Sequence, residues 1–180
     1  LDHHATTPVD PRVLEEMLPY FTEKFGNASS LDHSFGYEAS VAVENAREII
    51  ANSIGARHDE IVFTSGATES DNIALIGTMS KYSDKGNHLI TCVTEHKAVL
   101  DTARYLESLG KKVTYLPVNE FGEIDLKELE NAITPETVMI SIMAANNEIG
   151  TIADVAAIGK IAHDHDVIFH TDAAQAVGHI

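Results

Sequence analysis

Four segments of the sequence place polar side chains directly behind apolar runs, where ligands of α/β proteins commonly lie. The first is Thr64-Ser65-Gly66-Ala67-Thr68, whose small residues would let backbone amides approach a ligand. A helix is expected to follow, and its unpaired N–H groups and positive dipole end favour a phosphate. The alternative is an ordinary turn with Thr68 as N-cap, since neither the Walker pattern nor the dinucleotide glycine fingerprint is matched.

The second and third segments offer an imidazole and an amide. His96 follows an apolar run that ends at Val93, so its ring could stack on a ligand or move protons, or could simply cap a helix. Asn147 follows another apolar run and could orient a ligand. The pair Asn146-Asn147 is also typical of a turn, and local pattern alone favours the turn.

The fourth segment contains Asp172 and Gln175. An aspartate at the end of a buried strand is costly to desolvate unless it has a partner, and a protonated ring nitrogen would serve. An N-cap for a following helix is the alternative. The position of Gln175, three residues further on, favours a shared ligand site.

Two other signals are weaker. The run His163-Asp164-His165-Asp166 resembles a metal cluster, but Val167 and Ile168 stand where a binuclear metallohydrolase needs Asp and His. We therefore expect no metal site. Cys92, the only cysteine, excludes an internal disulfide and lies in an apolar strand, where a cysteine is usually inert.

The elements that must position these side chains alternate along the chain. Apolar strands rich in Val and Ile are expected at 61–64, 88–93, 112–118, 138–143 and 167–171. Helices are expected at 68–79, 97–109, 126–133 and 155–163, the last two capped by Asp125 and Asp154. This alternation predicts an α/β fold with a mostly parallel sheet and helices on both faces. Ligands of such sheets bind at the carboxyl ends of the strands, where the four segments lie.

Two further helices are expected before the first strand. Asp10-Pro11 is typical of an N-cap followed by proline at the first helical position, and this helix should end near Phe21. Apolar residues at helical spacing predict a second helix that ends before Gly55.

Composition excludes several classes of function. The 180 residues are 44% hydrophobic and 22% charged, as in an ordinary globular protein. A net charge of −16 argues against binding to nucleic acid or to an anionic membrane. No uncharged run approaches the roughly 20 residues that cross a bilayer. Because one cysteine allows no internal disulfide, a reducing, cytoplasmic setting is expected. No secretory signal is apparent, and both ends of the sequence suggest a fragment.

Together the segments resemble the pyridoxal-phosphate (PLP) enzymes of the aspartate-aminotransferase type. More narrowly, they resemble the cysteine desulfurases of the NifS/IscS type, in the class V aminotransferase family. The resemblance spans the chain in order, and the runs from Phe63 and from Thr94 are its most specific parts. The matching residues are Leu1-Asp2, Ala5–Pro8, Phe25-Gly26-Asn27, Ser29-Ser30, His33, Gly36, Phe63–Asn72, Thr94–Leu100, Asn146–Gly150 and Asp172–Gln175.

The resemblance implies the roles of the site residues. The expected cofactor-binding residues are Ala67, Thr68, His96, Asn147, Asp172 and Gln175. The family's phosphate-binding turn falls on Ala67 and Thr68. Its ring-stacking histidine, an acid/base and the expected catalytic residue, falls on His96. Its aspartate at the pyridinium nitrogen falls on Asp172, where it would keep the ring able to accept electrons.

Two amides complete the implied site. The family's glutamine at the ring hydroxyl falls on Gln175, and its asparagine near the ring and the substrate carboxylate falls on Asn147. The implied reaction converts L-cysteine to L-alanine and an enzyme-bound persulfide for iron–sulfur cluster or thio-cofactor assembly. A sulfur-acceptor or scaffold protein would be the partner, and family members are homodimers. Selenocysteine lyase, another class V enzyme and a non-catalytic PLP-binding or scaffold protein remain alternatives.

The sequence departs from the family in lacking both covalent groups. The family's Schiff-base lysine follows the aspartate segment in a Ser-x-His-Lys run, whereas all eight lysines of this chain precede Asp172. The nucleophilic cysteine lies later still, and Cys92 does not match it. We therefore expect residues 1–180 to be one segment, the N-terminal arm and about the first two thirds of the PLP-binding large domain. The C-terminal remainder would be absent and the segment alone inactive.

Overall fold

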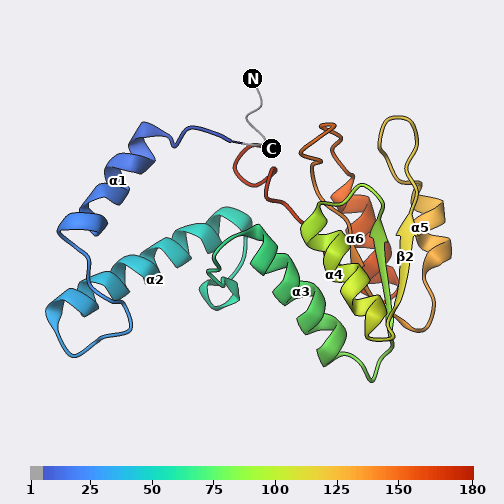
Figure 1. Ribbon diagram of the computed structural model, residues 1–180, viewed down its shortest axis with the longest axis horizontal. Helices are drawn as coiled ribbons and strands as arrows, with labels where there is room; N and C mark the ends of the chain where they lie inside the picture. The colour runs from blue at the N-terminus through green and yellow to red at the C-terminus, as the bar shows by residue number, and fades with distance from the viewer. Residues whose placement is uncertain (1–5) are drawn as a thin grey trace. The chain divides into compact units, whose positions relative to one another are not determined.

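The computed structural model describes residues 6–180 and divides the chain into two compact units, 1–63 and 64–180 (Figure 1). The units are described separately below. The part of the family resemblance carried by Leu1-Asp2 and Ala5 lies outside the described residues.

The first unit contains the two helices that the sequence predicts. Helix α1, Pro11–Thr22, is capped by Asp10, whose Oδ1 accepts the Arg12 N–H at 2.8 Å. Helix α2, Ser34–Ile54, ends at Gly55, which adopts a left-handed conformation with φ of 70°. A short 3-10 helix, η1, follows at His58–Glu60. Both expected caps are confirmed, because each depends only on neighbouring residues.

The loop between α1 and α2 packs against the first turn of α2 with no space for side chains at two glycines. A Cβ on Gly36 would lie 1.7 Å from the Ser30 carbonyl oxygen, and a Cβ on Gly26 would lie 2.1 Å from that of Phe35. His33 caps α2 by accepting the Gly36 N–H on Nδ1 at 3.1 Å. Several residues of the family resemblance therefore have a packing role in this unit.

The second unit contains a parallel sheet of four strands in the order β2-β1-β3-β4. The strands are β1, His88–Cys92; β2, Lys112–Leu116; β3, Thr137–Ser141; and β4, Ile168–His170. Each successive connection carries a helix, as parallel pairing requires. The predicted parallel α/β architecture is confirmed.

Four helices cover the two faces of this sheet (Figure 1). Helices α3 and α4 form one core with Leu89, while α5 and α6 form another with Ile90, because neighbouring side chains of a strand point to opposite faces. Each fully buried aliphatic side chain of this kind stabilises the fold by about 1.5–3 kcal/mol. The helices are α3, Ala67–Lys81; α4, Lys97–Ser108; α5, Leu126–Ala132; and α6, Val155–Asp164.

The prediction of a strand at 61–64 is wrong. This segment has extended backbone at Ile61 but pairs with no strand among residues 6–180. Arg47 of α2 donates to the Ile61 carbonyl instead, and its guanidinium carbon lies 4.9 Å from the centre of the Phe63 ring. An apolar run becomes a strand only where a neighbour supplies a hydrogen-bonding edge, and the run alone does not reveal this.

The contact at Gly36 yields a stability prediction. Gly36→Ala should lower the free energy of unfolding of the full chain by about 2 kcal/mol or more, because backbone must move to admit the new Cβ. Gly77→Ala is the matched control, since a Cβ there meets nothing within 4 Å inside helix α3. Helix propensity should make that change neutral or stabilising by up to about 1 kcal/mol. Chemical denaturation would measure both, and equal effects would contradict the packing argument.

Candidate active site

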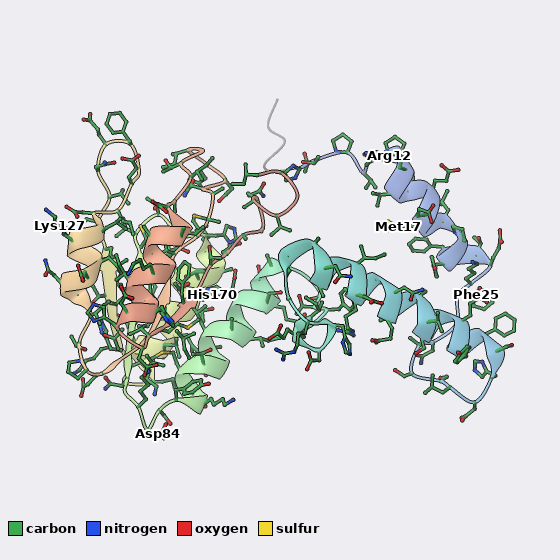
Figure 2. The ribbon with its side chains drawn as sticks, turned by 180° about the vertical axis from the view of Figure 1, so that it is seen from behind. Arg12, Met17, Phe25, Asp84, Lys127 and His170 are labelled. Atoms are coloured by element: carbon green, nitrogen blue, oxygen red, sulfur yellow. The ribbon has the colours of Figure 1, made fainter. Side chains whose placement is uncertain are left out.

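The sequence-predicted residues lie on loops at the carboxyl edge of the sheet. The loops after β1, β3 and β4 emerge there because all four strands run in one direction. Helix α3 ends at the amino-terminal edge of the sheet, where the turn that contains Asp84 leads into β1 (Figure 2). The first residues of α3 therefore lie at the opposite, carboxyl edge. His170, also labelled in Figure 2, ends β4 at the same edge.

Ala67 and Thr68 form the exposed first turn of α3, which begins after Gly66. The N-cap is Gly66, so the alternative in which Thr68 caps the helix is wrong. Glu69 accepts the Ser65 N–H at 2.6 Å, and hydrogen bonds from Ser65 hold the pKa of the Glu69 carboxyl below its usual range. The amides of Ala67 and Thr68 lie in the helix's first turn, where intrahelical acceptors are lacking and an anion is favoured.

His96 is the N-cap of α4, as one of the two sequence interpretations expected. Its Nδ1 accepts the Ala98 N–H at 3.1 Å, and its side chain is exposed. In this arrangement a neutral imidazole carries its proton on Nε2. Capping therefore fixes one ring nitrogen and leaves the other available to a ligand.

Two hydrogen bonds, together called the clamp below, join the loop that carries His96 to the loop that carries Asn147. Asn146 donates from Nδ2 to the Thr94 carbonyl at 2.8 Å, and Glu95 accepts the Met143 N–H on Oε1 at 2.8 Å. The Asn146 Oδ1 also accepts two amides of its own turn. Asn147 itself is half-buried beside this clamp. The sequence indicated a turn at this point but gave no sign that Asn146 would bind another loop.

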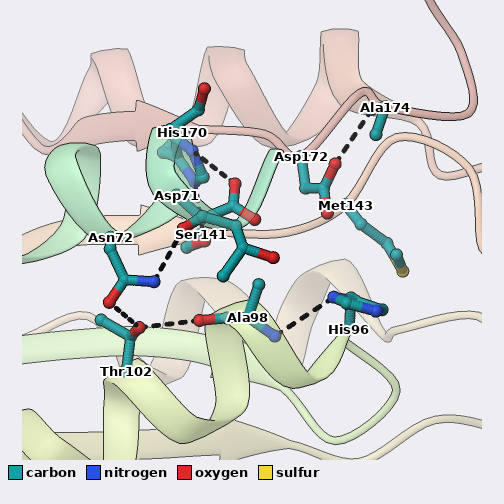
Figure 3. Close-up of polar contacts among 12 residues, drawn as sticks. Asp71, Asn72, His96, Ala98, Thr102, Ser141, Met143, His170, Asp172 and Ala174 are labelled. Atoms are coloured by element: carbon teal, nitrogen blue, oxygen red, sulfur yellow. Dashed lines mark hydrogen bonds and ion pairs between the residues drawn. The ribbon is translucent and has the colours of Figure 1, made fainter. Parts of the chain in front are cut away.

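Asp172 is buried, with 8% of its surface exposed, directly after β4 (Figure 3). Its Oδ1 accepts the Ala174 N–H at 2.9 Å, and its carbonyl accepts the Ala144 N–H at 2.9 Å. Gln175 follows within a turn and is half-buried. Within residues 6–180, no hydrogen bond joins Gln175 or Asn147 to the other predicted site residues.

Two further buried carboxylates, which sequence reasoning missed, accompany Asp172. Burial, then the charge of Asp172, raises the pKa of Asp71 to about 6, and nearby His96 opposes this rise. Burial also raises the pKa of Glu95 to about 8, with Asp172 and Asp71 adding to the effect. Asp71, Asp172 and His96 are thus brought together. Both Asp71 and Glu95 lie in polar runs of the sequence, 69–72 and 94–97, which give no sign of their burial.

The other chemical signals have structural explanations. Cys92 is buried at the end of β1, its Sγ lies 3.2 Å from the Thr94 hydroxyl, and burial raises the pKa of its thiol. Asp164 pairs with Lys160 at 2.5 Å and Asp166 pairs with Lys85 at 2.9 Å. Within residues 6–180, no cluster of three His, Cys, Asp or Glu side chains could hold a metal.

The helices described for residues 6–180 include none with the length and apolarity to cross a membrane.

Comparison with known proteins gives one family for the whole chain. The aminotransferase class-V family model matches residues 1–180. Cysteine desulfurases IscS of Rickettsia typhi and Rickettsia bellii are each 57% identical over 180 residues, which are 100% of this chain and 44% of each relative. The chain therefore spans less than half the length of these curated relatives.

Solved structures agree with this match. A NifS-like protein superposes with a TM-score of 0.94 at 44% identity, covering 98% of this chain and 49% of that one. SspA in complex with cysteine gives a TM-score of 0.92 at 46% identity, covering 97% and 50%. DndA from Streptomyces lividans gives 0.87 at 41% identity, covering 98% and 49%.

The buried Glu95 yields a pH-dependent stability prediction. Its folded pKa of about 8 lies above the ordinary glutamate value of 4.5, so wild-type stability falls as pH rises between these values. Glu95→Gln removes this titration and keeps an acceptor for the Met143 N–H. It should stabilise the cofactor-free protein by roughly 2–4 kcal/mol at pH 8 and by less than about 1 kcal/mol at pH 5.

Denaturant titration at the two pH values measures this difference. The exposed Glu128→Gln on α5 is the matched control and should show little difference. A Glu95→Gln effect of equal size at both pH values would show that the carboxyl is ionised in the folded state.

Proposed function

The chain belongs to the aminotransferase class-V family, and from this we propose that the complete protein is a PLP-dependent cysteine desulfurase. It converts L-cysteine to L-alanine and an enzyme-bound persulfide. The high identity to IscS cysteine desulfurases supports this reaction, and so does the similarity to SspA in complex with cysteine.

One observation carries the proposal: the buried carboxylate of Asp172 lies at the same edge of the sheet as the exposed first turn of α3. Asp71 Oδ2 and Glu95 Oε2 are buried without a hydrogen-bond partner in the described chain, and Asp172 is buried next to them. Because the pKa values of Asp71 and Glu95 are raised, Asp172 is the acid of the three that favours a cation, whereas the first turn of α3 favours an anion. A protonated pyridine ring that carries a phosphate has both charges, so the residues present fit PLP.

Ala67 and Thr68 would hold the phosphate through their amides and the Thr68 hydroxyl. Asp172 would hold the ring nitrogen, because the Ala174 N–H occupies its Oδ1 and leaves Oδ2 for a ligand. When bound, PLP supplies a protonated ring that accepts the electrons released as the substrate Cα loses its proton. The Asp172 carboxylate keeps that ring nitrogen protonated.

We assign His96 two roles: it stacks on the face of the cofactor ring, and it transfers protons. Because Ala98 occupies its Nδ1, proton exchange takes place at Nε2. The Glu95–Met143 and Asn146–Thr94 bonds fix the loop that carries it. We assign Asn147 to the substrate carboxylate and ring, and Gln175 to the ring hydroxyl.

Residues 1–180 provide the N-terminal arm and about the first two thirds of the PLP-binding large domain in this proposal. The Schiff-base lysine and the nucleophilic cysteine belong to the remainder of the protein. The persulfide passes to a sulfur-acceptor or iron–sulfur scaffold protein, and the complete enzyme acts as a homodimer in the cytoplasm.

Replacement of Asp172 tests the proposed activity. In the complete protein, Asp172→Ala should lower the rate of alanine release from L-cysteine by about 100-fold or more, the scale of losing one preorganised electrostatic partner. Asp84→Ala is the control, since Asp84 is exposed in the turn at the opposite edge. Near wild-type turnover of the Asp172 variant would show that the ring nitrogen does not depend on this carboxylate.

The segment by itself gives a second test. Residues 1–180 mixed with PLP should show no adduct that borohydride fixes at one lysine, because none of the eight lysines has the family's Ser-x-His-Lys context. Visible absorption and mass spectrometry after reduction would measure this. Fixation at one specific lysine would assign the covalent role to a residue within this segment.

A further inference from the structure

Asp71 and His170 connect the two elements on which the proposed cofactor depends (Figure 3). Asp71 lies on α3, one helical turn after Ala67, and His170 is the last residue of β4, two residues before Asp172. Asp71 Oδ1 and His170 Nε2 are 3.6 Å apart. This contact therefore joins α3 to the end of β4 close to both Ala67 and Asp172, beside the apolar packing of α3 on the sheet.

The contact is buried, and the His170 ring is oriented by a hydrogen bond to β3. The side chains of His170 and Asp71 are 16% and 4% exposed. The other ring nitrogen of His170 lies 2.9 Å from the Ser141 hydroxyl on β3, which fixes the ring plane. A polar contact that is buried in this way is directional, whereas apolar packing at the same place would tolerate sliding.

The next residue of α3 makes a second connection, to helix α4. Asn72 Oδ1 lies 2.9 Å from the Thr102 hydroxyl, and its Nδ2 donates to the Thr68 carbonyl at 2.7 Å. The Thr102 hydroxyl also lies 2.7 Å from the Ala98 carbonyl, in the first turn of the helix that His96 caps. Consecutive residues of α3 thus contact both elements that would bind the ring.

We propose that Asp71 is a positioning residue, which through His170 holds the phosphate-binding turn at a fixed distance from Asp172. This inference rests on the proposed function, because it concerns a ligand with a phosphate at one end and a ring nitrogen at the other. A rigid ligand binds well at both ends only if the two sites keep their separation. Asp71 contacts neither end, so it acts through the elements it joins.

The test compares ligands that occupy both sites with ligands that occupy one. In the complete protein, Asp71→Ala and His170→Ala should each weaken PLP binding about tenfold, equivalent to about 1.4 kcal/mol. The double variant should lose no more than either single variant, since both remove one contact. Affinities for inorganic phosphate and for pyridoxal, which lacks the phosphate, should change less than about twofold, within the range in which distant sites behave independently.

Three controls separate positioning from folding. Asp71→Asn keeps a polar oxygen facing His170 Nε2 and should retain PLP affinity to within about threefold. Asp71→Leu removes a buried carboxylate, is expected to fold, and should weaken PLP binding as Ala does. Asp101→Asn, an exposed residue of α4, should leave PLP affinity unchanged. Unfolding free energies of the cofactor-free variants show whether stability alone follows the substitution.

The outcomes are distinct. Unchanged PLP affinity in Asp71→Ala and Asp71→Leu would overturn the positioning role, and so would equal losses for PLP, pyridoxal and phosphate, which would indicate general damage to the site. Additive losses in the double variant would overturn it too, because they would show that the two residues act separately. Failure of the wild-type protein to bind PLP would overturn the proposed function as well, and is distinguished by the wild-type measurement.

Discussion

A carboxylate withdrawn from water needs a proton, a hydrogen bond or a cation, and this requirement governs the carboxyl edge of the sheet. The three buried acids meet it differently. Glu95, with a pKa raised to about 8, keeps its proton at neutral pH. Asp71 lies against His170. Asp172 receives the Ala174 amide on one oxygen and remains the acid best placed to meet a cationic ligand.

The parallel sheet stabilises this cluster of buried acids. Because every strand ends at the same edge, the loops can bond to one another, and Asn146 and Glu95 do so through backbone groups of Thr94 and Met143. The two cores beneath, with Leu89 on one face and Ile90 on the other, supply the apolar burial that offsets desolvation of the acids. Stability and site chemistry are thus separated within one unit.

Sequence reasoning succeeded where the physical cause is local. Asp10, Asp125 and Asp154 each cap a helix as expected, because an aspartate bonds to amides two or three residues away. It failed for 61–64, where strand formation depends on a distant edge. The position of Asp172 followed from the strand pattern and the family resemblance.

The acids Asp71 and Glu95 were missed for a different reason. Their importance arises from burial and mutual proximity, which join residues 71, 95 and 172 only after folding. Gly66 was likewise overlooked as a helix cap, because glycine offers no side-chain bond to signal it.

The clamp between the β1 and β3 loops has a consequence for evolutionary drift. Its acceptor at Thr94 is a carbonyl and its donor at Met143 is an amide, and any residue other than proline supplies both groups. Substitutions at Thr94 can therefore accumulate without loosening the loops, whereas the Met143 side chain also takes part, with its Sδ 3.3 Å from Asn146 Nδ2. Asn146 and Glu95 contribute side chains, so selection on loop geometry should act on them instead.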